Sequence, residues 1–208
     1  MSTRLNPITV DNTDFLITSM IERCPKTMMI RELFKNAEEA ASQATPGNRR
    51  IEFGITYVGP RRAPKLTIWN TGPGMDDAEL AAMTNLAASL GKTMGLDDNF
   101  GMGAKVASLP SNKLGLRYRS CKNGRVHEVL LGYLDGAYGR IRRFNLAGEN
   151  LGDVVDVTDA VAGEGLRQLD YDWTEVVLVG NRPEQNTVLD PYDGDPAMQK
   201  MWLAVSLY

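Results

Sequence analysis

The stretch TMMIRELFKNAEEAASQ, residues 27–43, decides the fold, because it predicts the strongest helix of the chain. Its apolar residues recur every three or four positions and form one stripe along the helix. Pro46 and Gly47 end the pattern. The stripe contains Ile30, Leu33, Phe34, Ala37 and Ala41, and the opposite, solvated side contains Arg31, Lys35, Glu38 and Ser42.

Three polar residues of this helix belong to neither side. Glu32, Asn36 and Glu39 are spaced four and three residues apart, so they share one narrow strip of the helix surface. Because four other residues already supply a solvated side, we interpret this strip as functional.

The remaining pattern places helices mainly before strands. We expect helices over 13–23 and 76–88, and a short helix from Ala104. Strands are expected over 51–58, 65–69 and 174–179, with a β-meander over 113–145. This order predicts an α+β fold, a two-layer sandwich whose mixed, mostly antiparallel sheet carries helices on one face.

Composition excludes several classes of protein. The 208 residues are 43% hydrophobic and 24% charged, with a net charge of −3, which is ordinary for a globular domain. The sequence contains no apolar run of membrane-spanning length and no signal-peptide pattern. Two cysteines are too few for a disulfide framework or a zinc cluster, so we expect a reducing, cytoplasmic location.

Two glycine-rich stretches could approach a ligand closely. Residues 70–75, NTGPGM, follow a predicted strand, and residues 101–105, GMGAK, open a predicted helix where backbone N–H groups attract phosphate. Each stretch alone is weak evidence for a site. A dinucleotide fingerprint fails at Val106, and a phosphate-loop motif ending at 91–93 fails at Leu86.

Taken in order, these stretches resemble the motifs of the GHKL ATPase superfamily, which includes gyrase B-type, heat-shock chaperone, histidine kinase and mismatch-repair ATPases, with MORC proteins as relatives. RELFKNAEEA resembles the N-box, NTGPGM the G1 box and NFGMGAK the G2 box. WTEVVL is similar to the late strand that bears a threonine, and TNLAASLGKT to the mobile ATP lid. The resemblance spans residues 31 to about 179 and implies the Bergerat ATP-binding fold.

The resemblance also implies roles for individual residues. Glu32 matches the general base that activates water, and Asn36 matches the Mg²⁺ ligand. Glu39, beside Ala40, matches a position near the purine or ribose, and Thr174 matches the threonine that binds adenine through water. The base pocket would contain Gly72, Gly74 and Met75, and the phosphates would lie on Gly101, Met102, Gly103, Ala104 and Lys105, with Lys92 closing from the lid.

One position departs from the family pattern. The family has Asp at the start of the G1 box, where the carboxylate accepts a hydrogen bond from the adenine amino group, and this chain has Asn70. An amide oxygen also accepts, but it is uncharged and its NH₂ group adds a donor. Retained adenine preference and altered base preference both stay open at this point.

The resemblance implies an ATP-binding domain over 1–182, then an acidic loop and the start of a helix over 183–208 that leads into a further domain. Binding of ATP and Mg²⁺ with hydrolysis would close the lid and drive homodimerisation of a larger protein, with a protein or nucleic-acid client left open. The alternatives are a non-hydrolysing nucleotide sensor or assembly module and, less favoured, a kinase module. His127 lies in an alternating strand pattern, which indicates a structural role.

Alternating arginines in the meander region are interpreted as a solvated sheet edge. A nucleic-acid surface is the alternative, and the acidic pI of about 5.3 does not favour it. These arginines are Arg117, Arg119, Arg140, Arg142 and Arg143.

Overall fold

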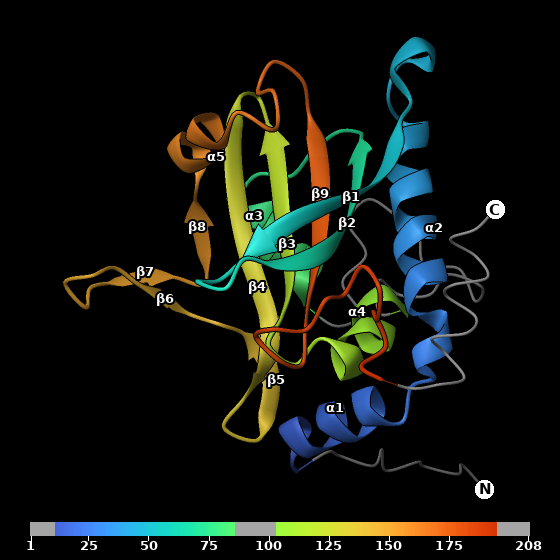
Figure 1. Ribbon diagram of the computed structural model, residues 1–208, viewed down its shortest axis with the longest axis vertical. Helices are drawn as coiled ribbons and strands as arrows, with labels where there is room; N and C mark the ends of the chain where they lie inside the picture. Colours follow the sequence, from blue (N-terminus) through green and yellow to red (C-terminus); the bar gives the residue numbers. More distant parts are fainter. Residues whose placement is uncertain (1–10, 86–102, 195–208) are drawn as a thin grey trace, which may run out of the picture.

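The computed structural model describes residues 11–85 and 103–194, and it has the predicted α+β architecture (Figure 1). The helices are α1 (Thr13–Glu22), α2 (Met29–Ser42), α3 (Asp77–Thr84), α4 (Gly103–Ser108) and α5 (Thr158–Glu164). The strands are β1 (Ile51–Val58), β2 (Ala63–Thr71), β3 (Gly115–Lys122), β4 (Arg125–Leu134), β5 (Ala137–Arg140), β6 (Arg143–Phe144), β7 (Asn150–Gly152), β8 (Val154–Asp156) and β9 (Trp173–Gly180). None of the helices in these two ranges has the length and apolar content that a membrane crossing requires.

One antiparallel sheet organises the domain. Its strands follow the order β1-β2-β9-β3-β4-β5, with β8 pairing the free half of β4 next to β5. All pairings between the strands described are antiparallel. The late strand β9 inserts between β2 and β3, and this crossover places residues 173–180 in the centre of the sheet.

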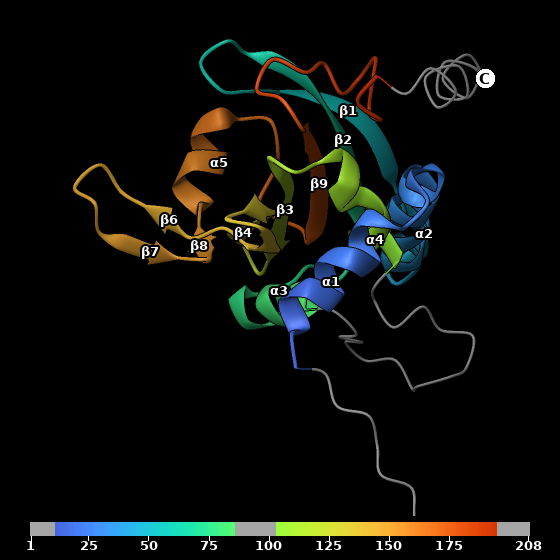
Figure 2. The same cartoon turned by 90° about the horizontal axis from the view of Figure 1, so that it is seen from below.

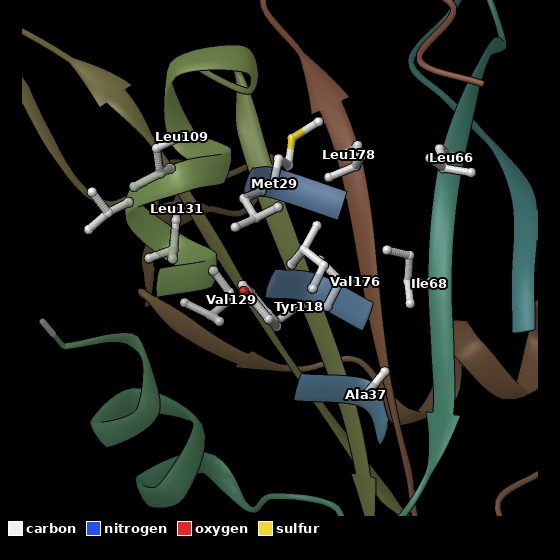
Figure 3. Packing of buried hydrophobic residues seen from close by; sticks show 14 of the residues in the cluster. Met29, Ala37, Leu66, Ile68, Leu109, Tyr118, Val129, Leu131, Val176 and Leu178 are labelled. Carbon is white, nitrogen blue, oxygen red and sulfur yellow. The ribbon is translucent and has the colours of Figure 1, made fainter. Parts of the chain in front are cut away.

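The main hydrophobic core lies between the sheet and α2, α4 and α1. Figure 3 shows Met29 and Ala37 of α2 facing the apolar side chains of the central strands, among them Ile68, Tyr118 and Val176. Burial of this apolar surface holds α2 across the sheet. The polar side predicted for α2 is exposed as expected.

Phe34 is the one member of the predicted apolar stripe that the structure places in solvent. Its side chain is 41% exposed and stacks on Phe53 of the edge strand, with 6.2 Å between the ring centroids. The physical reason is the position of α2, which packs over β2 and leaves the outer strand β1 largely uncovered.

A smaller core lies on the opposite face of the sheet. There α5 contributes Val161, which packs with Trp69, Cys121, Val126 and Trp173 from four neighbouring strands. The strand register places these residues on the face that α2 does not cover. Figure 2 shows α5 and α1 on opposite sides of the sheet.

The interpretation of the meander arginines as a solvated edge is wrong for two of them. Arg117 and Arg119 lie on the central strand β3, and both pair with the buried carboxylate of Glu128 on β4. Arg143 pairs with the same carboxylate. Burial raises the pKa of Glu128, but the guanidinium groups of Arg117 and Arg119 outweigh this effect and hold the pKa below its usual value.

Residues 181–194 fold back onto the sheet. Thr187 is fully buried, and its hydroxyl accepts from the backbone N–H of Leu66 and donates to the carbonyl of Leu178. Tyr192 joins the main core, and its hydroxyl is hydrogen-bonded to the backbone of Ile30. The acidic loop predicted to follow residue 182 is therefore packed against the domain as far as Gly194.

Candidate functional site

The predicted N-box and G2 box meet in front of the sheet. Glu32 is only 3% exposed, although it is a carboxylate, and its Oε1 pairs with Nη1 of Arg31 at 2.9 Å. The other oxygen points at the start of α4, where a β-carbon at position 103 would lie 2.5 Å from Oε2 of Glu32. A larger residue at position 103 would require the end of the Glu32 side chain to shift.

The three residues of the polar strip of α2 differ in burial. Glu32 is buried, Asn36 is exposed and Glu39 is half-buried. The three side chains share one strip of the helix but differ in their exposure to solvent. Near the end of the helix, the carbonyl oxygen of Ala40 faces Gly72, where a β-carbon would lie 2.8 Å from it. The helix α2 therefore contacts Gly72 as well as Gly103.

The G1 turn is held against the central strands. Gly74 has φ +58°, and a β-carbon there would overlap the backbone carbonyl of Cys121. Next to it, the backbone N–H of Met75 donates to Oγ of Ser120 at 2.8 Å. A left-handed backbone in close contact with a neighbouring strand explains why glycine occupies position 74.

Asn70 and Thr174 are direct partners in the β2–β9 register, and Ser120 is the partner of Thr174 on its other side. The hydroxyls of Ser120 and Thr174 are 2.9 Å apart. Asn70 is buried and its Nδ2 donates to the carbonyl of Thr71 at 2.9 Å. The expected adenine-binding residues therefore form one polar row across the sheet, beside Met75.

Ser120 is a member of this row that the motifs did not identify. It lies in an alternating strand segment with no motif of its own, and it reaches the site only because β9 pairs with β3. Its hydroxyl contacts Met75, Thr174 and the carbonyl of Trp173, so one side chain links the G1 turn to the late strand.

Lys105 lies in a different environment from the one expected for a phosphate ligand. The side chain is buried, and its Nζ donates to the carbonyls of Met83 and Asn85 at the end of α3. Desolvation lowers the pKa of this ammonium group to about 8. Lys105 thus joins α4 to the end of α3, with one of its three donors left over. The neighbouring Ala104 packs in the main core.

Three predicted site residues, Lys92, Gly101 and Met102, lie outside the described residues. Within the ranges 11–85 and 103–194, no group of three or more His, Cys, Asp or Glu side chains could hold a metal ion. A Mg²⁺ ion bound through one amide oxygen and a triphosphate does not need such a group, so the exposed Asn36 fits the limited role that the resemblance implies.

Two open cavities lie beside this arrangement. One, of about 450 Å³, lies between the start of α3, the β3–β4 turn and β8, and His127 is among its lining residues. The other, of about 330 Å³, lies between α1, α4 and β5, and it is lined in part by Lys105 and Arg140. Neither cavity is lined by Glu32, Asn70 or Thr174.

Comparison with known proteins adds no assignment. No family model matches the chain, and the search of curated proteins gave no match.

Proposed function

We propose that this chain binds ATP together with Mg²⁺ and hydrolyses the nucleotide, as its resemblance to the GHKL superfamily implies. The contact between Glu32 and Gly103 carries the proposal, because it joins a buried carboxylate to a glycine of the expected phosphate-binding box. A buried glutamate that faces a glycine-rich helix start has no evident role in packing. It suits a base that must be close to a phosphate without a side chain between them.

Each residue of the strip then has a distinct task. Glu32 accepts the proton of the attacking water through Oε2, while Arg31 holds Oε1. Asn36, one turn further along the exposed face, offers an amide oxygen to Mg²⁺, which supplies charge neutralisation for the phosphates when bound. Gly72 and Gly74 let the G1 turn lie close to α2 and β3, and this contact supports the base pocket.

The orientation of Asn70 favours adenine. Its Nδ2 donates one of its two N–H groups to the carbonyl of Thr71, and Oδ1 is the acceptor that the side chain can offer to a ligand. An oxygen that can only accept suits the amino group of adenine, whereas the same edge of guanine presents a carbonyl. We therefore propose that the amide replaces the family's carboxylate as an acceptor, with binding weakened by about 1 kcal/mol relative to a charged acceptor.

Calorimetric titration with ATP, ADP and GTP, with and without Mg²⁺, tests binding, the ion and the base preference together. The proposal predicts that ATP binds, that Mg²⁺ strengthens the binding and that GTP binds at least about tenfold more weakly. Equal affinity for ATP and GTP would refute the role of Asn70. Absence of heat with every nucleotide would refute the proposed function.

A second candidate is a nucleotide sensor that does not hydrolyse ATP. The observation in its favour is the ion pair between Arg31 and Glu32, since a carboxylate oxygen held by a guanidinium is not available to an attacking water. Phosphate release measured with Arg31→Gln separates the two candidates. If the unchanged chain hydrolyses ATP and loses this activity when Glu32 is replaced, the sensor is excluded. If ATP hydrolysis appears only in the Arg31→Gln variant, the sensor is supported.

Nucleotide-driven homodimerisation remains part of the proposal. The lid residues that would close over the nucleotide are outside the residues described, so its support comes from the resemblance alone. Sedimentation of the chain with and without a non-hydrolysable ATP analogue and Mg²⁺ tests it. A dimer that forms only with the analogue supports dimerisation, and an unchanged sedimentation coefficient contradicts it.

A further inference from the structure

An exposed apolar surface lies at the outer edge of the sheet. It consists of Phe53, Ile55 and Tyr57 on β1, which are 48%, 56% and 57% exposed, together with Phe34 of α2. We call these four residues the β1 apolar stripe. The register partners of the three strand residues are Ile68, Leu66 and Pro64 of β2. The three strand residues therefore point to the same side of the sheet as the main core.

The position of α2 explains why the stripe is exposed. Phe34 of α2 stacks on Phe53 at one end of the stripe. Ile55 and Tyr57 extend beyond it. Three large apolar side chains in succession on one side of an edge strand are unusual for a surface that faces water, and they indicate a packing partner.

The described part of the chain ends beside this surface. Thr187 donates its backbone N–H to the carbonyl of Pro64, the register partner of Tyr57, and residues 181–194 run alongside the β1–β2 hairpin (Figure 2). Tyr192 is then fixed to the backbone of Ile30, one helical turn from Phe34. The described chain therefore runs from the Tyr57 end of the hairpin to the first turn of α2, one helical turn before Phe34.

The sequence that follows is suited to cover it. Asp195 and Pro196 form a typical helix start, and Met198, Met201, Trp202 and Val205 recur at the spacing of one apolar helix face. Fourteen residues remain after Gly194, and as a helix they would be about 21 Å long. Phe53 to Tyr57 spans about 13 Å of strand, so the segment is long enough to lie over the whole stripe.

We propose that residues 195–208 of the same chain dock on the β1 apolar stripe as a helix, with Trp202 and Val205 against Ile55 and Phe53. The docked segment would place a second helix beside α2 and complete the helical layer over the edge of the sheet. This packing does not depend on nucleotide binding, and its test is independent of the proposed function.

Hydrogen exchange of the full chain measures the coverage of β1. Trp202→Glu places a charge on the docking face, so the amides of residues 53–57 should exchange at least about tenfold faster than in the unchanged chain. Lys200→Glu, on the opposite helix face, should leave their exchange unchanged. Equal exchange in all three proteins would overturn the proposal. So would protection that rises with protein concentration, since a second copy would then cover the stripe.

Disulfide formation gives a second measurement that does not depend on the stability of a charged variant. In the Phe53→Cys, Val205→Cys double variant, an intrachain bond between these positions should form at least about tenfold faster than in Phe53→Cys, Lys200→Cys. Peptide mapping distinguishes this bond from any that involves the free Cys24 or Cys121. Equal rates in the two double variants would overturn the docking geometry, because a loose tail would bring both positions to position 53 alike.

Discussion

The carboxylate of Glu32 lies directly against the α-carbon of Gly103, although the two residues are 71 positions apart in the sequence. The contact is possible because α2 and α4 pack side by side in front of the sheet. It places a buried acid at the point where the predicted phosphate-binding helix begins. This relationship connects the packing of the domain to its proposed chemistry.

Gly103→Ala should damage activity more than folding. The added methyl group would meet Oε2 of Glu32 and push the carboxylate from its position, and a displacement of about 1 Å can lower turnover about 100-fold. Gly163→Ala on α5 is the control, because no atom lies within 4 Å of its new β-carbon. Phosphate release by both variants tests this, and equal turnover would show that the Glu32–Gly103 contact has no catalytic importance.

Gly74→Ala should destabilise the domain more than Gly59→Ala. Both positions have positive φ, at +58° and +74°, so both substitutions cost about 1–2 kcal/mol of backbone strain. Only position 74 adds a clash with the carbonyl of Cys121, which should cost a further 1–3 kcal/mol or so. Urea unfolding compares the two variants, and equal losses of unfolding free energy would contradict the contact between the G1 turn and β3.

Asn70→Asp should lower stability, although the family pattern has Asp at this position. The carboxylate cannot donate to the carbonyl of Thr71, and its charge would be buried, so the loss should be about 1–3 kcal/mol at neutral pH. Asn36→Asp, on the exposed face of α2, is the matched control and should change the unfolding free energy by about 0.5 kcal/mol or less. A neutral effect of Asn70→Asp would mean that the amide is not anchored as described.

Lys105 should make the stability of the domain depend on pH above neutrality. Its pKa in the folded state is lowered to about 8 by desolvation, whereas the unfolded chain keeps its proton to about pH 10.5. Between these values the unfolded state binds more protons, so stability due to Lys105 rises with pH. Relative to Lys105→Met, the unchanged chain should gain on the order of 1–3 kcal/mol between about pH 7.5 and 9.5. Chemical denaturation measures the unfolding free energy of both proteins across this pH range. The same change with pH in both proteins would contradict the burial of this ammonium group.

Local pattern was sufficient to predict much of the fold. The spacing in α2 identified its exposed side and most of its buried side, and the strand patterns of β1, β2 and β9 lie within two residues of the observed bounds. The α5 helix was not predicted, because it is short and only Val161 is buried. Phe34 was placed in the core because a helical period does not show how far the neighbouring sheet extends.

The parts of the site that depend on strand order could not be predicted. Ser120 joins Thr174 and Met75 only because β9 lies between β2 and β3, a pairing that no local pattern encodes. The burial of Lys105 against the end of α3 has the same cause, since it depends on how two separate helices pack. The motifs predict which residues form the site, and tertiary contacts determine which atoms these residues face.

The central claim is that Glu32 is the base of an ATPase. Its most direct test is ATP turnover by Glu32→Gln beside calorimetric ATP binding, with Glu38→Gln on the exposed side of the same helix as the control. We predict that Glu32→Gln binds Mg²⁺-ATP with little change, while its turnover falls by about 10²- to 10⁴-fold and that of Glu38→Gln does not. Turnover by Glu32→Gln equal to that of the unchanged chain would contradict the account.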